Sequence, residues 1–113
     1  MKKEVNILET KYIIYYNSRK EDNALETKDG YTDNYSKKIV INTTFSEDWD
    51  VQDIDIYQKK VLRHEIVHAY LYESGLDCNS NKSYSWADNE EMVDWFAIQG
   101  PKIYKTYKEL GIL

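Results

Sequence analysis

The chain has 113 residues and a formal net charge of −5 at pH 7, with 31% charged and 14% aromatic residues. This length supports one hydrophobic core, and the composition is that of a globular chain, so we expect a single domain over residues 1–113. The mildly acidic balance, with lysine and arginine scattered along the chain, lacks the basic patch of nucleic-acid-binding proteins. We therefore expect no nucleic-acid partner.

The sequence carries no sign of export or of a membrane anchor. Residues 1–6 begin with charges, but no apolar run of signal-peptide length and no small-residue cleavage site follow. No stretch is long and apolar enough for a transmembrane helix. The single cysteine, Cys78, cannot form an internal disulfide and is compatible with a reducing compartment. We expect a cytoplasmic protein with no membrane partner.

Strands are predicted in the first half of the chain. Residues 6–16 are rich in β-branched and aromatic types, and we expect one long strand or a kinked pair there. A second strand is expected over residues 37–44, and its polar end indicates an exposed edge of the sheet. Between them, Asp29-Gly30 is a turn signal, and residues 24–26 are a candidate short strand.

The longest predicted helix contains the motif H-E-x-x-H. Its apolar spacing predicts a start near Val51 or Asp53 and an end at about Ser74. Gly75 suits the left-handed position that follows many helices. Residues 61–72 are apolar on nearly every side, which is typical of a helix buried in a core.

The motif places metal-binding side chains together. His64 and His68 are four residues apart, so they share one helix face and can aim both imidazoles at one point. Glu65 lies about 100° around the helix and can lean over that point without being a ligand. The pattern is a known zinc metalloprotease signature, in which such a carboxylate is the general base. The alternative is that His64 and Glu65 face solvent beside Arg63, while His68 is a hydrogen-bonded core histidine.

A polar loop and two further helices are expected after the motif helix. The predicted bounds are residues 76–86 for the loop, 87–99 for the next helix and 102–110 for the last one. Ser85 and Asp88 are rival N-caps of the first of these helices. Gly100-Pro101 is expected to break it, because proline suits the first turn of a new helix. The expected order of elements is β-β-α-α-α.

A third protein ligand must be a carboxylate or Cys78, because the chain has only two histidines. Glu90 and Asp94 are four residues apart and share a face of the predicted helix. One could complete the metal shell, while the other accepts a hydrogen bond from the outward N–H of a ligand histidine. Glu91 points elsewhere and is expected to be a solvated charge near the helix N-terminus. The alternative is that all three acids only decorate the start of the helix.

The motif H-E-x-x-H, followed after a short loop by N-E-x-x-x-D at residues 89–94, resembles the gluzincin class of zinc peptidases. The small size, the two-strand run before the motif helix and the run D-W-F-A at residues 94–97 are similar to minimal members of the ImmA/IrrE-like group of bacteria and phages. The resemblance covers residues 61–99. The chain lacks any further histidine, so it has no counterpart of the additional oxyanion-stabilising histidine of larger gluzincins or of the third histidine of metzincins.

This resemblance implies a fold and a set of site residues. The fold would be α+β and zincin-like, with a small antiparallel or mixed sheet packed on a central motif helix that two further helices follow. The implied cofactor is Zn²⁺, with His64, His68 and Glu90 as ligands. Asp94 would support a ligand histidine, and Glu65 would be the catalytic residue.

The implied function is a zinc metallopeptidase that acts on a peptide or protein substrate. Glu65 would take a proton from a zinc-activated water and return it to the leaving amine. The strand over residues 39–44 would pair with an extended peptide substrate. The alternatives are a zinc-binding regulatory or interaction module of the same fold without peptidase activity, and a metal-free helical interaction protein. The sequence assigns no oligomeric state.

Overall fold

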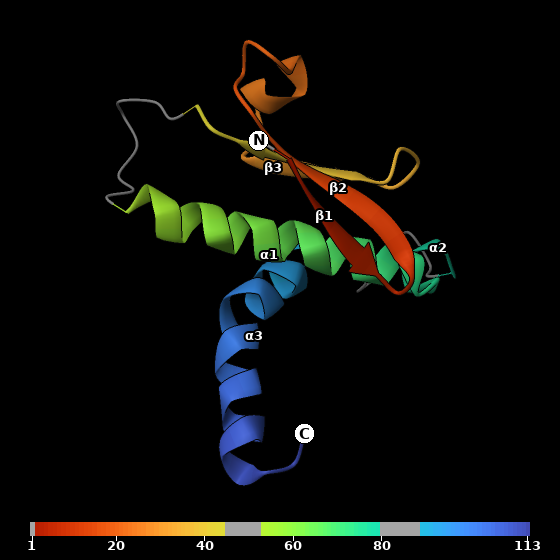
Figure 1. Cartoon of the computed structure of the whole chain (residues 1–113), viewed down its shortest axis with the longest axis vertical. Coiled ribbons are helices and arrows are strands. Elements are labelled where there is room, and N and C mark those ends of the chain that lie inside the picture. The colour runs from red at the N-terminus through yellow and green to blue at the C-terminus, as the bar shows by residue number, and fades with distance from the viewer. Residues whose placement is uncertain (1, 45–52, 80–88) are drawn as a thin grey trace.

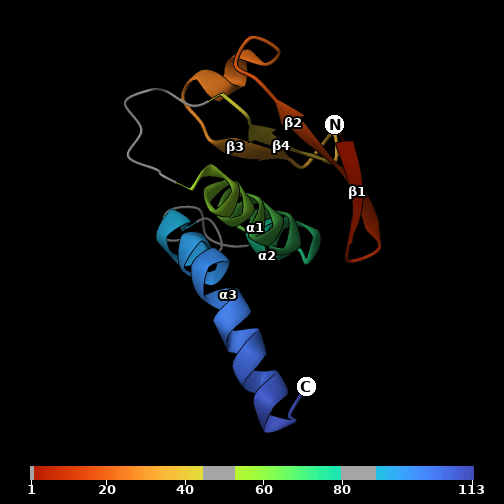
Figure 2. The same ribbon diagram turned by 60° about the vertical axis from the view of Figure 1, so that its left-hand side comes forward.

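A computed structural model describes residues 2–44, 53–79 and 89–113. The elements in these ranges are, in chain order, β1 (Lys2–Ile7), β2 (Thr10–Asn17), the 3-10 helix η1 (Asn23–Glu26), β3 (Gly30–Asp33), β4 (Lys38–Asn42), α1 (Ile54–Glu73), α2 (Leu76–Asn79) and α3 (Glu90–Leu110). The sheet covers one side of α1, and the first turns of α3 lie against the other side (Figure 2). The fold is therefore α+β, with the motif helix between a small mixed sheet and the last helix.

The four strands form one sheet in the order β1-β2-β4-β3. The β1–β2 and β3–β4 pairs are antiparallel, and β2 pairs with β4 in parallel. The prediction of an exposed edge at residues 37–44 is wrong, because β4 has a neighbouring strand on each side. Its polar end has another cause: buried Asn42 donates through Nδ2 to the carbonyl oxygens of Leu25 and Lys28 and so anchors the preceding loop.

The predicted strand over residues 6–16 contains a tight turn. Leu8 and Glu9 have positive φ angles of 49° and 71°, and they reverse the chain between β1 and β2. Two successive left-handed residues give the turn whose twist suits a two-residue hairpin. Leucine and glutamate are not usual in such a turn, so the sequence pattern did not reveal it. The candidate strand over residues 24–26 is also wrong, because these residues belong to η1.

The hydrophobic core lies between the sheet and α1. Its buried members are Ile7, Tyr12, Ile14, Ile39, Ile41, Val61 and Ala69. Along α1 the buried residues are Val61, Glu65 and Ala69, a four-residue spacing that marks one row facing the sheet. Within residues 61–72 only that row is buried and Tyr70 is 43% exposed, so the prediction that this segment is buried on nearly every side is wrong. The burial of Glu65 within an otherwise apolar row singles it out.

The predicted ends of α1 are confirmed. The side chain of the N-cap Asp53 accepts a hydrogen bond from the Ile56 N–H, as expected where the first N–H groups of a helix lack partners. Ser74 is the C-cap, and Gly75 follows with a φ of 83°. Beyond it, α2 lies within the predicted loop, and residues 80–86 of that loop are outside the described ranges.

One continuous helix, α3, replaces the two helices predicted near the C-terminus. It begins after Asn89, whose side chain accepts a hydrogen bond from the Met92 N–H. Ser85 and Asp88, the predicted N-caps, lie outside the described residues. The second half of α3 projects away from the rest of the molecule (Figure 1). Within the described ranges, no helix is both long and apolar enough to cross a membrane.

The predicted break at Gly100-Pro101 is wrong for a reason that the structure shows. Pro101 has no N–H to donate to the carbonyl oxygen of Ala97, four residues earlier. Arg63 of α1 donates through Nε to that oxygen instead, at 2.5 Å. This contact between helices replaces the missing bond, and α3 continues through Pro101 to Leu110.

Candidate metal centre

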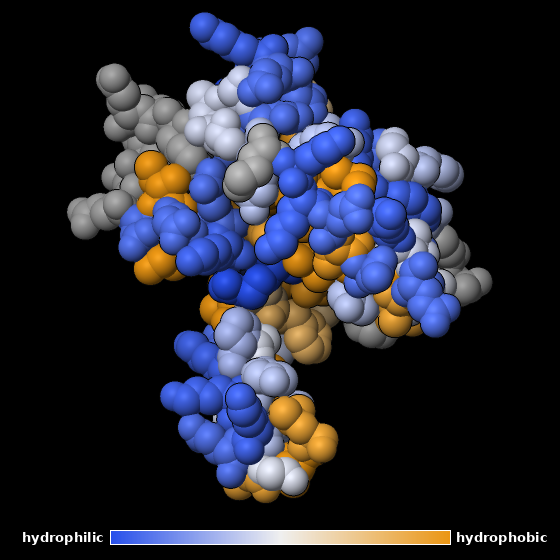
Figure 3. Space-filling model, in the orientation of Figure 1, coloured by the Kyte–Doolittle hydropathy of each residue, from blue (hydrophilic) through white to orange (hydrophobic). Residues whose placement is uncertain are grey.

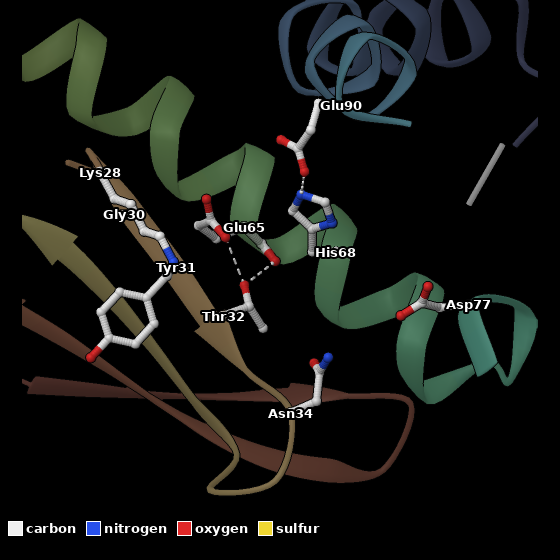
Figure 4. A pocket seen from close by; sticks show the side chains of 9 residues that line it. All are labelled: Lys28, Gly30, Tyr31, Thr32, Asn34, Glu65, His68, Asp77 and Glu90. Carbon is white, nitrogen blue, oxygen red and sulfur yellow. Dashed lines mark hydrogen bonds and ion pairs between the residues drawn. The ribbon is translucent and has the colours of Figure 1, made fainter. Parts of the chain in front are cut away.

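Three side chains from two helices converge on one point. Glu90 Oε2 lies 2.9 Å from His64 Nε2, and Glu90 Oε1 lies 2.9 Å from His68 Nε2. The two Nε2 atoms are 3.2 Å apart, and their rings meet edge to face. Glu90 reaches from the start of α3 toward His68 on α1 (Figure 4). The predicted sharing of one face by His64 and His68 is thus seen directly.

The chemistry of this donor set fits a metal ion. One ligand atom from each of His64, His68 and Glu90 can be chosen so that all lie within 4.8 Å of one another. In a tetrahedral site with bonds of about 2.0–2.1 Å, neighbouring ligand atoms are about 3.3–3.4 Å apart, close to the distances here. Two imidazole nitrogens that face each other and a carboxylate can all direct lone pairs at one cation. The group could therefore hold a metal ion.

Asp94 contacts the second ring nitrogen of His64, and Lys60 contacts Asp94. His64 Nδ1 lies 3.1 Å from Asp94 Oδ1, and Lys60 Nζ contacts the same oxygen at 3.1 Å. Partial burial would raise the pKa of Asp94, but the hydrogen bonds from Lys60 and His64 outweigh it and bring the pKa below its ordinary value. An ionised Asp94 favours the proton on Nδ1, which leaves the lone pair of Nε2 facing Glu90 and His68. Lys60 was not predicted, although it lies one helical turn before His64.

Glu65 is buried beside these residues, with 7% of its surface exposed. It lines a cavity of about 380 Å³ together with His68 and Glu90 (Figure 4). Thr32 Oγ1 lies 2.9 Å from Glu65 Oε1 and 3.0 Å from the Glu65 carbonyl oxygen. Burial raises the pKa of Glu65, and the Thr32 hydrogen bond and the nearby histidines offset this only in part. The alternative of a solvent-facing Glu65 does not describe this structure.

Gly30 allows β3 to lie close enough to α1 for this contact. A Cβ atom at Gly30 would lie 2.9 Å from the Val40 carbonyl oxygen and 3.0 Å from Val61 Cγ1. Such close approach of a backbone to its neighbours requires glycine. Thr32 is two residues further on, so its side chain lies on the same face of the strand as the missing Gly30 side chain. The Asp29-Gly30 pair, predicted as a turn, therefore leads directly into the strand that reaches Glu65.

The remaining candidates lie elsewhere. Glu91 is exposed on α3 and is not among the three clustered donors. The side chain of Cys78 is outside the described part of the structure. Lys28 and Asp77 line the cavity but were not predicted, because no motif or spacing links them to the histidines. Thr32 was missed for the same reason.

Comparisons with protein-family models, with curated proteins and with solved structures find no match to this chain. The resemblance to gluzincins therefore depends on the motif residues of the chain itself and on their geometry.

Proposed function

We propose that this protein is a zinc-dependent metallopeptidase with a zincin-like fold, similar to the minimal ImmA/IrrE-like group. The observation that carries the proposal is the position of Glu65. This buried carboxylate shares one cavity with His68 and Glu90, two of the three clustered donors. A purely structural metal site has no need of a buried, uncoordinated carboxylate beside it, whereas hydrolysis needs a general base there.

Zinc is the proposed ion because of the donor set. Two imidazole nitrogens and one carboxylate are common zinc ligands, and three protein ligands are typical of catalytic sites, where a fourth position serves water or substrate. When bound, zinc supplies Lewis-acid activation of a water molecule and of a substrate carbonyl group. His64, His68 and Glu90 would hold the ion, and Asp94 would orient His64.

Glu65 is proposed to move the proton. It accepts the proton of the attacking water and returns it to the amine that leaves. Burial raises the pKa of Glu65 toward neutral pH. A general base whose pKa is nearer the working pH both accepts and returns a proton more readily. Thr32 fixes Oε1 of this carboxylate and so orients the second oxygen, Oε2.

The proposed substrate is an extended peptide that adds to β3 on the side away from β4, where none of the described strands pairs with it. The Asn42 N–H donates to the Asp29 carbonyl oxygen across the β3–β4 pair. Because backbone groups alternate in direction along a strand, those of Gly30 and Thr32 point away from β4. Both residues also line the cavity that contains Glu65. Strand addition of a peptide at this edge fits the site, whereas residues 39–44 cannot take that role because β4 is an inner strand.

Substitution of Glu65 by glutamine tests the mechanism. Labelled casein and a mixture of fluorogenic peptides would serve as probes, with Glu91→Gln as the matched control. We expect Glu65→Gln to keep zinc and to lose cleavage by about 10²-fold or more, since general acid–base catalysis contributes about 10²–10⁴-fold. If Glu65→Gln binds zinc and cleaves as fast as the unchanged protein, the proposed mechanism is wrong.

A second candidate function is a zinc-binding interaction module without peptidase activity. The observation that favours it is the exposed apolar surface of α3, where Tyr107 is 46% and Leu110 is 66% exposed. In that case the metal would link α1 to α3 and stabilise a binding surface. Stoichiometric zinc, no turnover of either probe and no effect of Glu65→Gln on partner binding would favour this function.

A further inference from the structure

The second half of α3 has an apolar face that no described element covers. The helix packs on α1 through its first turns, and its buried residues are Val93 and Ala97. Beyond Gly100 no residue of the helix is buried. Apolar atoms gather at the far end of this projecting half (Figure 3). An isolated helix of this length is only marginally stable in water. The projecting half of α3 therefore needs a packing partner to be stable.

The apolar face has the spacing of a helix that packs against another helix. Its residues, which we call the α3 stripe, are Phe96, Gly100, Ile103, Tyr107 and Leu110. They are separated alternately by four and three residues, the repeat of the a and d positions of a coiled coil. Phe96, Tyr107 and Leu110 are each at least 44% exposed. A helix is therefore the partner that this face fits.

We propose that the α3 stripe binds the same stripe of a second copy of this chain, in antiparallel orientation, with Ile103 at the twofold axis. The stripe is complementary to itself about that residue. Phe96 and Leu110 are each seven residues from Ile103, so they face each other across the pair. Gly100 and Tyr107 lie three residues before it and four after it, so each tyrosine ring lies over the partner's glycine. A Cβ atom at Gly100 would meet nothing within 4 Å, which leaves room for that ring.

The charges beside the stripe favour a second copy over a charged partner. The residues next to it on the helix surface are uncharged: Gln99, Tyr104 and Thr106. In coiled coils these flanking positions set partner choice through attraction or repulsion of charges. Two copies therefore meet without repulsion between like charges. An acidic or basic partner would find no opposite charge at these positions.

An apolar hollow at one end of the stripe supports the antiparallel orientation. It has a volume of about 310 Å³ and lies between α1 and α3, lined by Val67, Tyr70, Leu71, Met92 and Phe96. Antiparallel pairing brings the end of the partner's stripe, with Leu110 and the exposed Ile112 and Leu113, to this hollow. In a twofold pair each copy fills the hollow of the other, so the contact closes on itself.

Sedimentation velocity on the full, zinc-loaded chain over a wide concentration range tests the pairing. We expect a species of twice the 13.5 kDa chain mass, and we expect Ile103→Glu to reduce it to the mass of one chain. Ile98→Glu is the matched control, since Ile98 is exposed on the opposite side of α3 and should leave the pair intact. Circular dichroism would confirm that both variants keep their helices. A monomer at every concentration, or a pair that Ile103→Glu leaves intact, overturns the proposal.

Disulfide cross-linking in a Cys78→Ser background tests the orientation. We expect Ile103→Cys to cross-link with itself, because two copies of this residue meet at the axis within disulfide range. Phe96→Cys alone should not cross-link, whereas a mixture of Phe96→Cys and Leu110→Cys should. Self-cross-linking of Phe96→Cys would mean parallel pairing. That result, or a monomer that binds anionic lipid vesicles through the stripe, contradicts the proposal, and neither depends on peptidase activity.

Discussion

The hydroxyl of Thr32 on β3 donates a hydrogen bond to the carboxylate of Glu65 on α1, with 2.9 Å between Oγ1 and Oε1. The same hydroxyl lies 3.0 Å from the Glu65 carbonyl oxygen. One edge-strand residue thus fixes both the side chain and the backbone of the proposed general base. The strand to which a peptide would be added and the residue that would act on that peptide are joined by this contact.

Replacement of Thr32 by valine should weaken the fold and the proposed catalysis. Valine keeps the shape but leaves the buried Glu65 carboxylate without its donor, which should lower the free energy of unfolding by about 1–3 kcal/mol. Urea denaturation measures this change. Thr32→Ser restores the hydroxyl and should recover most of the loss. Equal destabilisation by valine and serine would show that the methyl group, and not the hydrogen bond, is what matters.

Replacement of Asp94 by asparagine should weaken metal binding without abolishing it. Asp94 accepts from His64 Nδ1 and so favours the tautomer with a lone pair on Nε2. Loss of such a supporting carboxylate typically reduces metal affinity about 10–100-fold. Competition with a chromogenic chelator measures the affinity, and Glu91→Gln is the matched control on the same helix. Unchanged metal affinity in Asp94→Asn would show that Asp94 does not support a metal ligand.

Arg63 and Pro101 should be energetically coupled. In the native chain the Ala97 carbonyl oxygen depends on Arg63, and Arg63→Met should cost about 1.5–3 kcal/mol, as for other hydrogen bonds from charged groups. In a Pro101→Ala background a new backbone N–H can serve the same carbonyl group. The cost of Arg63→Met should then be smaller, and a double-mutant cycle measures the difference. Strict additivity of the two substitutions would contradict this explanation of the unbroken helix.

The carboxylate of Glu73 should make stability depend on pH in the acid range. Hydrogen bonds from Lys37 and Tyr12, each 2.7 Å from Glu73 Oε2, hold the pKa of Glu73 below its ordinary value. The folded state thus favours the ionised form, so this contribution to stability is present above about pH 4.3, the ordinary glutamate pKa, and is lost as pH falls. The free energy of unfolding, measured with urea, should fall less steeply with decreasing pH for Glu73→Gln than for the unchanged protein. If the free energy of unfolding depends on pH equally in the two proteins, protonation of Glu73 does not affect stability.

Local patterns predicted the motif helix and its cluster well. The spacing of His64 and His68 places both imidazoles on one face, and this geometry depends only on the helix. Gly75 was correctly predicted to follow the helix, and Asp53, one of two predicted starts, is its N-cap. The choice of Glu90 over Glu91 also followed from helical periodicity, and the structure brings Glu90 to the histidines.

Contacts between distant segments account for what the sequence did not reveal. The Leu8-Glu9 turn contradicts the local preferences of its residues and is imposed by pairing of β1 with β2. The bond from Arg63 to Ala97 carries a helix through a proline. Thr32 reaches Glu65 only because Gly30 lets a strand approach the helix. None of these pairings leaves a periodic signal in the sequence.

The metal content of the purified protein is the most direct test of the proposed zinc site. The protein would be prepared without a chelator or a histidine tag and measured by inductively coupled plasma mass spectrometry, beside Glu90→Ala and Glu91→Ala. We expect near one zinc ion per chain, kept in Glu91→Ala and lost in Glu90→Ala, because Glu90 contacts both histidines whereas Glu91 is not among the clustered donors. A chain that binds no metal even after zinc is added would contradict the proposed site and the proposed peptidase together.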